Sequence, residues 1–165
     1  MRVEAPIKVD RKTKRLAKRL TGREIAVINH MDIDEVAANS LVEGKVKLVI
    51  NAAQSISGKY PNKGPGILTD KNILIIDNVG QELFDELKEG QIIEVNNGQI
   101  YRDGQLLGEG SVLDKDKVAI KIKEAYDNMS VELDRFIDNT IEYAKKEKGF
   151  ILGEVEIPKV KTKYK

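Results

Sequence analysis

Three short apolar stretches decide the fold of this chain: residues 24–29 (EIAVIN), 47–51 (KLVIN) and 73–77 (ILIID). Each is typical of a buried strand. Between the first two, residues 32–41 predict a helix that Gly44 ends, because Asp32 can accept the Glu35 amide and Glu35 lies in the positively charged first turn. A strand, a helix and a second strand in this order predict a parallel pair.

Weaker patterns extend this unit on both sides. The predicted elements are an opening strand or extended arm over 2–9, a basic helix over 10–20 capped by Asp10, an irregular segment over 52–66, a helical turn near 67–71 and a helix over 81–88 with Gly90 as its cap. From residue 91 the apolar period falls to two. The Asn97-Gly98 turn joins 92–95 to 99–101 as a hairpin, and Asp103-Gly104 repeats the signal before 105–112. The chain is thus predicted to be an α/β fold completed by a small antiparallel meander.

Residues 115–148 predict one long helix that Asp114 caps. Its apolar residues recur at steps of three and four from Val118 to Ala144 and form a continuous stripe. The helix would be about 50 Å long, whereas a body of roughly 110 residues is about 35 Å across. We therefore expect the helix to overhang its domain, and its stripe to need a second copy, a downstream domain or a bend in the helix. The residues expected to mediate association are Ile122, Met129, Leu133, Phe136 and Ile137.

The composition narrows the possible functions. The 165 residues, 41% of them hydrophobic and 33% charged, fit an α/β domain over 1–113, a long amphipathic helix over 114–149 and a basic linker over 150–165. The absence of cysteine excludes disulfides, thiolate zinc sites and cysteine nucleophiles, and a single histidine excludes the usual catalytic or metal-binding pairs. No apolar run is long enough to span a bilayer, so we expect a cytoplasmic location without membrane contact by this segment. We expect no cofactor.

The net charge of +1 is unevenly distributed. Residues 1–23 carry nine Lys/Arg against Glu4 and Asp10, and residues 157–165 carry four lysines and no acid, so the middle of the chain is acidic. Basic clusters attract polyanions. No aromatic residue is interleaved with the N-terminal bases to stack on a nucleotide, so we expect them to face water or the acidic body, without a nucleic-acid partner.

Residues 53–60 (AQSISGKY) follow a strand and nearly match the phosphate-binding Walker pattern. Tyr60 stands where that pattern needs a short hydroxyl, and Pro61 interrupts the helix whose N-terminus would bind phosphate. Two interpretations stay open: a looser anion site around the glycines of the 53–66 loop, or a surface loop with turn chemistry, which we favour. The candidate ligand-binding residues are Asn51, Ser55, Ser57, Gly58, Lys59, Tyr60, Asn62, Gly64, Asp77 and Asn78, with Lys63 beside them.

His30, Asp32 and Asp34 are candidate metal ligands, because an imidazole and two carboxylates can bind a metal ion. Their position after a strand also suits ligand binding in α/β proteins. However, Asp32 is already expected to cap a helix, and carboxylates two residues apart at a cap diverge. We therefore expect no metal site.

The order of elements over 47–101, with residues 89–95 (EGQIIEV) followed by Asn97-Gly98, looks like the swivelling phosphohistidine domain of phosphoenolpyruvate-utilising enzymes. In that family a Thr-Ser-His loop precedes the helix, and its histidine takes the phosphoryl group. The matching residues here are 61–64 (PNKG), without a histidine. The resemblance implies a swivelling β/β/α-like domain and argues against phosphoryl carriage.

A second resemblance covers nearly the whole chain. It is carried by residues 10–20 (DRKTKRLAKRL), 27–41 (VINHMDIDEVAANSL), 49–65 (VINAAQSISGKYPNKGP), 75–90 (IIDNVGQELFDELKEG) and 139–152 (NTIEYAKKEKGFIL). These blocks resemble the N-terminal region of SteA-like cytokinetic ring proteins. In that family the tail leads into a domain similar to the catalytic region of thiamin pyrophosphokinase, followed by a membrane segment that anchors the full-length protein at the division site. The resemblance implies that this chain is the N-terminal module alone and that any kinase activity belongs to the downstream domain.

Together these observations favour a non-catalytic regulatory or assembly module associated with cell division. It would act through helix-mediated association, as a homo-oligomer or with a partner helix, and would position the downstream domain. The alternative is a domain that senses a phosphate or nucleotide ligand through the 53–66 loop. An enzyme is least favoured, because no acid/base pair or activated nucleophile can be named.

Overall fold

The computed structural model describes the backbone of residues 2–151 and the side chains of residues 2–147. Within these residues, eight strands form one sheet in the order β7-β6-β5-β1-β2-β3-β4-β8. The strands are β1 (Arg2–Val9), β2 (Ile25–Ile28), β3 (Leu48–Asn51), β4 (Ile75–Asp77), β5 (Ile92–Asn96), β6 (Gln99–Arg102), β7 (Gln105–Glu109) and β8 (Ser111–Leu113). The helices are α1 (Thr13–Ala17), α2 (Glu35–Glu43), α3 (Gly64–Asp70), α4 (Gln81–Glu86) and α5 (Lys115–Ile151). The predicted α/β class, with its meander and long C-terminal helix, is confirmed.

The centre of the sheet is parallel. Strands β1, β2, β3 and β4 are parallel neighbours, whereas β5 and β8 flank them in antiparallel pairing. The strand–helix–strand unit predicted from residues 24–51 is confirmed by the register of β2 on β3, in which Ile25 pairs with Leu48 and Ile28 with Asn51. Because the strands are parallel, their carboxyl ends meet at one edge of the sheet, which we call the carboxyl edge.

The two tight turns of the meander are also confirmed. Asn97 and Gly98 have φ angles of +49° and +88°, and Asp103 and Gly104 have +51° and +75°. Positive φ at both central residues is the signature of a type I′ hairpin turn, which asparagine, aspartate and glycine tolerate best. The resulting hairpins pair β5 with β6 and β6 with β7.

Residues 105–112 were predicted as one strand, and this is wrong. The stretch is divided at Gly110 into β7 and β8, which lie at opposite ends of the strand order. The amide of Gly110 donates to the carbonyl of Gly98 at 2.9 Å, and a Cβ at Gly110 would lie 2.5 Å from the carbonyl oxygen of Asp77. Only a glycine allows the chain to pass this close to two other backbones. At Gly110 the chain leaves its pairing with β6 and begins its pairing with β4.

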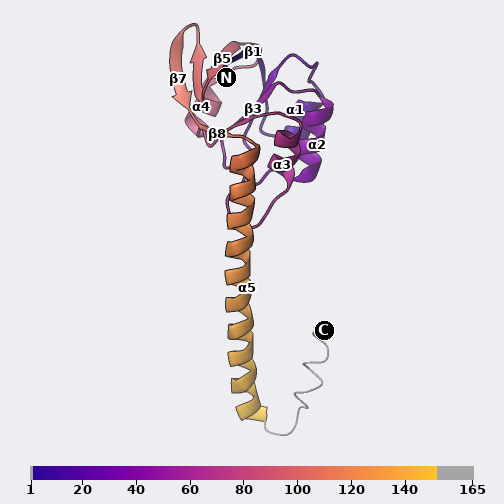
Figure 1. Ribbon diagram of the computed structural model, residues 1–165, viewed down its shortest axis with the longest axis vertical. Coiled ribbons are helices and arrows are strands. Elements are labelled where there is room, and N and C mark those ends of the chain that lie inside the picture. Colours follow the sequence, from indigo (N-terminus) through magenta and orange to yellow (C-terminus); the bar gives the residue numbers. More distant parts are fainter. Residues whose placement is uncertain (1, 152–165) are drawn as a thin grey trace. The chain divides into compact units, whose positions relative to one another are not determined.

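Both faces of the sheet are covered by apolar side chains. On one face, Leu16 of α1, Leu41 of α2, Leu68 of α3 and Val118 of α5 are buried in one cluster with β2, β3 and β4. Figure 1 shows α1, α2 and α3 grouped on one side of the strands. The other face has a second cluster, in which Leu83 and Phe84 of α4 pack with residues of β1, β5 and β6. The central strands β2 and β3 are therefore covered on both faces.

Two predicted helix starts are corrected. The basic helix over 10–20 shortens to α1, whose N-cap is Lys12 and not Asp10. The Asp10 carboxylate accepts the Lys12 amide and the Arg15 guanidinium. At α2 the capping residue is Asp34, which accepts the Ala37 amide at 2.7 Å.

Two further predicted caps are confirmed, and a third is wrong. Gly44 caps α2, and Asp114 caps α5 by accepting the Lys117 amide at 2.9 Å. The helix predicted to extend to residue 88 instead ends at Glu86, with Leu87 as its cap. Gly90 serves another purpose, because its amide donates to the Ile7 carbonyl at 3.0 Å and so joins the segment to β1.

The chain divides into two units. The first extends from Met1 to Tyr126, past the boundary expected at 113, because Val118 and Ala125 of α5 are buried in it. The second starts at Asp127. The basic linker expected over 150–165 lies outside the described residues from position 152 onward. None of the helices in the described part of the chain has the length and apolarity needed to cross a bilayer.

Candidate functional site

The carboxyl edge is organised by the side chain of Asn51, the last residue of β3, which is fully buried. Its Oδ1 accepts the His30 amide at 3.0 Å and the Ala53 amide at 3.1 Å. Its Nδ2 donates to the His30 carbonyl at 2.9 Å and to the Ser55 hydroxyl at 2.8 Å. All four hydrogen-bonding positions of the amide are therefore occupied, and the end of β3 is bound to the segment after β2 and to the 53–66 loop.

Ser55 continues this network to β4. Its amide and its hydroxyl both donate to Oδ1 of Asp77, at 2.9 and 2.7 Å. Its carbonyl accepts Nδ2 of Asn62 at 2.7 Å, and the same nitrogen donates to the Ile33 carbonyl at 3.0 Å. Ser55, Asn62 and Asp77 are all buried. The polar residues predicted to bind a ligand thus hold the loop against the sheet.

The remaining loop candidates are divided between inward and outward positions. The amide and hydroxyl of Ser57 donate to the Asp32 carboxylate at 2.7 and 2.9 Å, which is why Asp32 does not cap α2. Lys59 and Tyr60 are exposed. Asn62 Oδ1 is the one buried side-chain polar atom in the described residues without a hydrogen-bond partner. An amide oxygen only accepts hydrogen bonds, so this atom gives no support to an anion, and the anion site stays a prediction.

Gly64, another candidate, has a structural role at the start of α3. A Cβ built on it would lie 2.1 Å from the carbonyl oxygen of Ile33 and 2.7 Å from that of Asp34. The close packing of α3 on the start of α2 therefore depends on the missing side chain.

We predict that Gly64→Ala lowers the free energy of unfolding by about 2–4 kcal/mol, because backbone atoms cannot move aside as a flexible side chain can. Gly66→Ala is the matched control, since a Cβ there meets nothing within 4 Å. In the interior of the same helix it should raise stability by about 0.5–1 kcal/mol. Urea unfolding of both variants measures the difference, and equal midpoints would contradict the packing described.

Burial raises the pKa of Asp77, and the hydrogen bonds from Ser55 and the positive charge of Lys121 only partly oppose it. The native state therefore binds this proton more tightly than the unfolded chain does. It follows that the contribution of Asp77 to stability is greatest at low pH and is lost as the pH rises from the unfolded pKa through the raised folded one.

We predict that Asp77→Asn raises the free energy of unfolding at pH 7, because the amide oxygen still accepts from Ser55 without a buried charge. The gain should vanish at acidic pH, where Asp77 is already protonated. Asp77→Ala should lose about 1–3 kcal/mol at both pH values, because the buried Ser55 donors lose their acceptor. Urea unfolding of the three proteins at the two pH values tests this. If Asp77→Asn is as damaging as Asp77→Ala at pH 7, the buried charge is not the cause.

A pocket of about 660 Å³ lies beside the carboxyl edge, between the α1 segment and the chain that follows β2. Thr13, buried at its base, places its Oγ1 2.7 Å from Nδ1 of His30. Five exposed cations line one side: Arg11, Lys12, Lys14, Arg15 and Lys18. Further lining comes from Asn29, His30, Met31, Asp34 and Ala37. We call this feature the cationic pocket.

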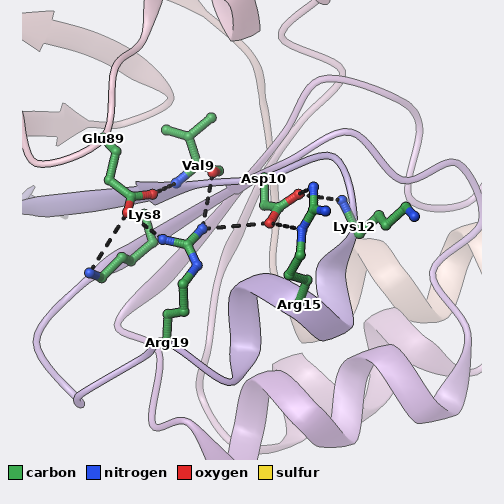
Figure 2. A network of polar contacts seen from close by, with 7 residues as sticks. All are labelled: Lys8, Val9, Asp10, Lys12, Arg15, Arg19 and Glu89. Carbon is green, nitrogen blue, oxygen red and sulfur yellow. Dashed lines mark hydrogen bonds and ion pairs between the residues drawn. The ribbon is translucent and has the colours of Figure 1, made fainter.

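Asp10 binds two of the residues that line the cationic pocket, Lys12 and Arg15 (Figure 2). Its carboxylate accepts two hydrogen bonds from the Arg15 guanidinium, both at 2.7 Å, and the Lys12 amide at 3.0 Å. Arg19 lies 3.6 Å away. The hydrogen bonds from Arg15 lower the pKa of Asp10 to about 2, although burial opposes them. Asp10 thus fixes the start of α1 as an ionised group.

Arg19 extends these contacts to Glu89 (Figure 2). The Arg19 guanidinium pairs with the Glu89 carboxylate and donates to the Val9 carbonyl at 3.2 Å. Glu89 also accepts the Val9 amide at 3.0 Å. Burial raises the pKa of Glu89, but the Val9 amide and Arg19 outweigh it and the net shift is downward. The end of β1 is therefore held by two carboxylates of low pKa.

We predict that Asp10→Asn lowers the free energy of unfolding at pH 7 by about 1–2 kcal/mol, a range reduced because the Arg15 side chain is 63% exposed. Since the folded pKa lies below the unfolded one, this stability is present above the unfolded pKa and is lost as the pH falls through about 2. The two proteins should therefore converge in acid. Glu109→Gln, at an exposed acid, serves as the control and should change neither the midpoint nor its pH dependence.

The candidate metal ligands do not converge. His30 contacts Thr13, Asp32 binds Ser57, and Asp34 caps α2. Within residues 2–147, no three His, Asp or Glu side chains gather as potential metal ligands.

The association residues predicted on α5 fall into two settings. Ile122 is half-buried and packs against the core cluster that contains Val118. Met129, Leu133, Phe136 and Ile137 belong to the second unit and are 41%, 56%, 66% and 45% exposed. Tyr143, on the same helix, is 65% exposed. We call Met129, Leu133, Phe136, Ile137 and Tyr143 the association stripe.

No protein-family model matches this chain, and no curated protein is significantly similar to it. The two family resemblances described from the sequence therefore stay predictions.

The cationic pocket was not predicted from the sequence, although the basic run and the histidine that form it were both noted there. The basic run over 11–18 was interpreted as a solvated face, and His30 was considered only with Asp32 and Asp34. The basic run follows β1 and His30 follows β2, and these two strands are parallel neighbours. Their places in the sequence could therefore have indicated that they lie side by side. Residues that follow adjacent parallel strands meet at the same edge.

Proposed function

We propose that this chain is a non-catalytic assembly module that associates with a second copy of itself through the association stripe. The observation that carries the proposal is the exposure of large apolar side chains on the second unit, with Phe136 at 66% and Leu133 at 56%. Contiguous apolar surface of this kind marks interaction sites in soluble proteins. The polar side chains of the carboxyl edge serve the fold instead, as Asn51, Ser55 and Asp77 show.

The spacing of the stripe supports a helical partner. Four residues of the stripe, Met129, Leu133, Phe136 and Tyr143, fall on a repeat with steps of four and three that Thr140 completes and that begins in the sequence at Ala119. Ile137 lies beside this repeat. A seven-residue apolar repeat is the pattern of paired helices, in which side chains of one helix fit between those of the other. Thr140 is the one polar member, and its hydroxyl donates to the Phe136 carbonyl at 2.8 Å within its own helix.

The distribution of charge favours a second copy as the partner. Most acids of this region, including Asp127, Asp134, Asp138 and Glu142, fall at repeat positions away from the stripe. The positions that flank the stripe are mainly uncharged, with Ser130, Asn139 and Ala144 among them. Two identical helices can therefore approach along the stripe without bringing their acids together.

The size of the stripe indicates a reversible dimer. Fully burying a Leu, Phe or Met side chain contributes about 1.5–3 kcal/mol, and the residues here are already partly covered by their own helix. Association costs about 4–15 kcal/mol in lost freedom of motion. Two copies of a five-residue stripe give a gain of the same order, so the dimer should depend on protein concentration.

The cellular role rests on the resemblance to SteA-like cytokinetic ring proteins. We propose that dimerisation of this module serves bacterial cell division by bringing together two copies of a downstream domain similar to thiamin pyrophosphokinase. A fluorescent fusion of the full-length protein that stays dispersed in dividing cells would contradict this role while leaving the dimer itself unaffected.

We predict that Phe136→Asp weakens dimerisation by about tenfold or more, because it places an unpaired charge in the buried seam. Val131→Asp is the matched control: Val131 is 55% exposed on the same helix but lies off the stripe. Light scattering over a range of concentrations should show a dimer for the wild type and for Val131→Asp, and a monomer for Phe136→Asp.

Neither substitution should change the unfolding of the first unit, because both positions lie beyond Tyr126. A wild-type protein that is monomeric at every concentration would refute the proposal. Equal loss of mass in both variants would show that charge on the helix, and not the stripe, controls association.

A further inference from the structure

The cationic pocket has the position and size of a ligand site. It lies where β2 ends at the carboxyl edge, the place at which parallel α/β sheets bind their ligands. Its volume of about 660 Å³ is within the range of small-molecule sites, roughly 300–1,000 Å³. The site is separate from the association stripe and from the 53–66 loop.

Most of the positive charges that line the pocket have no carboxylate partner. Its one lining carboxylate, Asp34, is engaged with the Ala37 amide, and Asp10 pairs with Arg15 and Arg19. Within residues 2–147, Arg11, Lys12, Lys14 and Lys18 form no ion pair. Like charges held this close repel one another, and a bound multivalent anion would relieve that repulsion.

The base of the pocket is rigid and polar. Buried Thr13 contacts Nδ1 of His30, and the backbone of His30 is bound on both sides by the side chain of Asn51. In the described residues His30 Nε2 makes no hydrogen bond, so this ring nitrogen is available to a ligand. A polar group beside a row of exposed cations suits an anion with several oxygen atoms.

Two observations favour a compact ligand over a nucleic acid. No Phe, Tyr or Trp side chain lines the pocket, so His30 supplies the one ring on which a base could stack and a run of bases has no platform. The cations belong to one eight-residue segment around a concave site and do not form a groove along several elements. We propose that the cationic pocket binds a small molecule that carries a diphosphate group, with Lys14 and Lys18 among the residues that hold the phosphates.

The test uses inorganic pyrophosphate as the probe and isothermal titration calorimetry as the readout. The wild-type chain should bind pyrophosphate, with an affinity that falls as salt is added. The double variant Lys14→Gln/Lys18→Gln should bind about tenfold more weakly. The control variant Lys47→Gln/Lys71→Gln removes the same charge from exposed lysines elsewhere and should bind within about twofold of wild type.

The single histidine gives a second, local readout. Pyrophosphate should shift the proton NMR signals of the His30 ring in the wild type and in any variant that still binds. A short single-stranded DNA serves as the competing ligand. The proposal is overturned if millimolar pyrophosphate does not bind, if both double variants lose affinity equally, if the His30 signals do not move on binding, or if the DNA binds more tightly than pyrophosphate through Lys14 and Lys18.

Discussion

The buried amide of Asn51 is the interaction on which the carboxyl edge depends. Its four hydrogen bonds use every donor and acceptor position of the side chain, so no other residue type can replace it in kind. Through them the end of β3 fixes the backbone of His30 and the hydroxyl of Ser55, which in turn binds Asp77 of β4. The cationic pocket and the 53–66 loop are therefore held by one buried group, and a polar core at this edge replaces the apolar packing that secures the rest of the sheet.

Elements specified by local pattern were predictable from the sequence. The parallel unit around β2 and β3 and the hairpin turns at Asn97-Gly98 and Asp103-Gly104 follow from apolar runs and from residues that tolerate positive φ. The predictions that were wrong concern features that depend on contacts between residues far apart in the sequence. The Asp10 carboxylate binds Arg15 and does not cap a helix, and Asp32 binds Ser57 instead of capping α2. The close crossing at Gly110 divides the last predicted strand. The spacing of residues along the sequence does not reveal which of these distant residues bind one another.

The candidate site was only partly predictable for the same reason. The sequence indicated that polar residues after the strands matter, but not whether they face inward or outward. Ser55 and Asn62, proposed as ligand contacts, are buried and bonded to the fold, whereas the lysines of 11–18, interpreted as a solvated face, line one side of a pocket. A polar side chain in a loop can satisfy its hydrogen bonds with protein or with solvent at similar cost, so only the fold decides. The apolar positions Met129, Leu133, Phe136 and Ile137 on α5 were predictable because helical periodicity alone defines them, whereas Tyr143 was not among the predicted residues.

The two surfaces proposed here depend on different forces, and this has a functional consequence. The cationic pocket works by charge, which salt screens within about 10 Å at moderate ionic strength, whereas the association stripe works by burial of apolar surface, which salt does not weaken. A rise in ionic strength should therefore release an anionic ligand and leave the dimer in place. Each unit of the chain carries one of these surfaces: the pocket belongs to the first, and Phe136 and its neighbours belong to the second. Ligand binding and assembly can thus be altered independently.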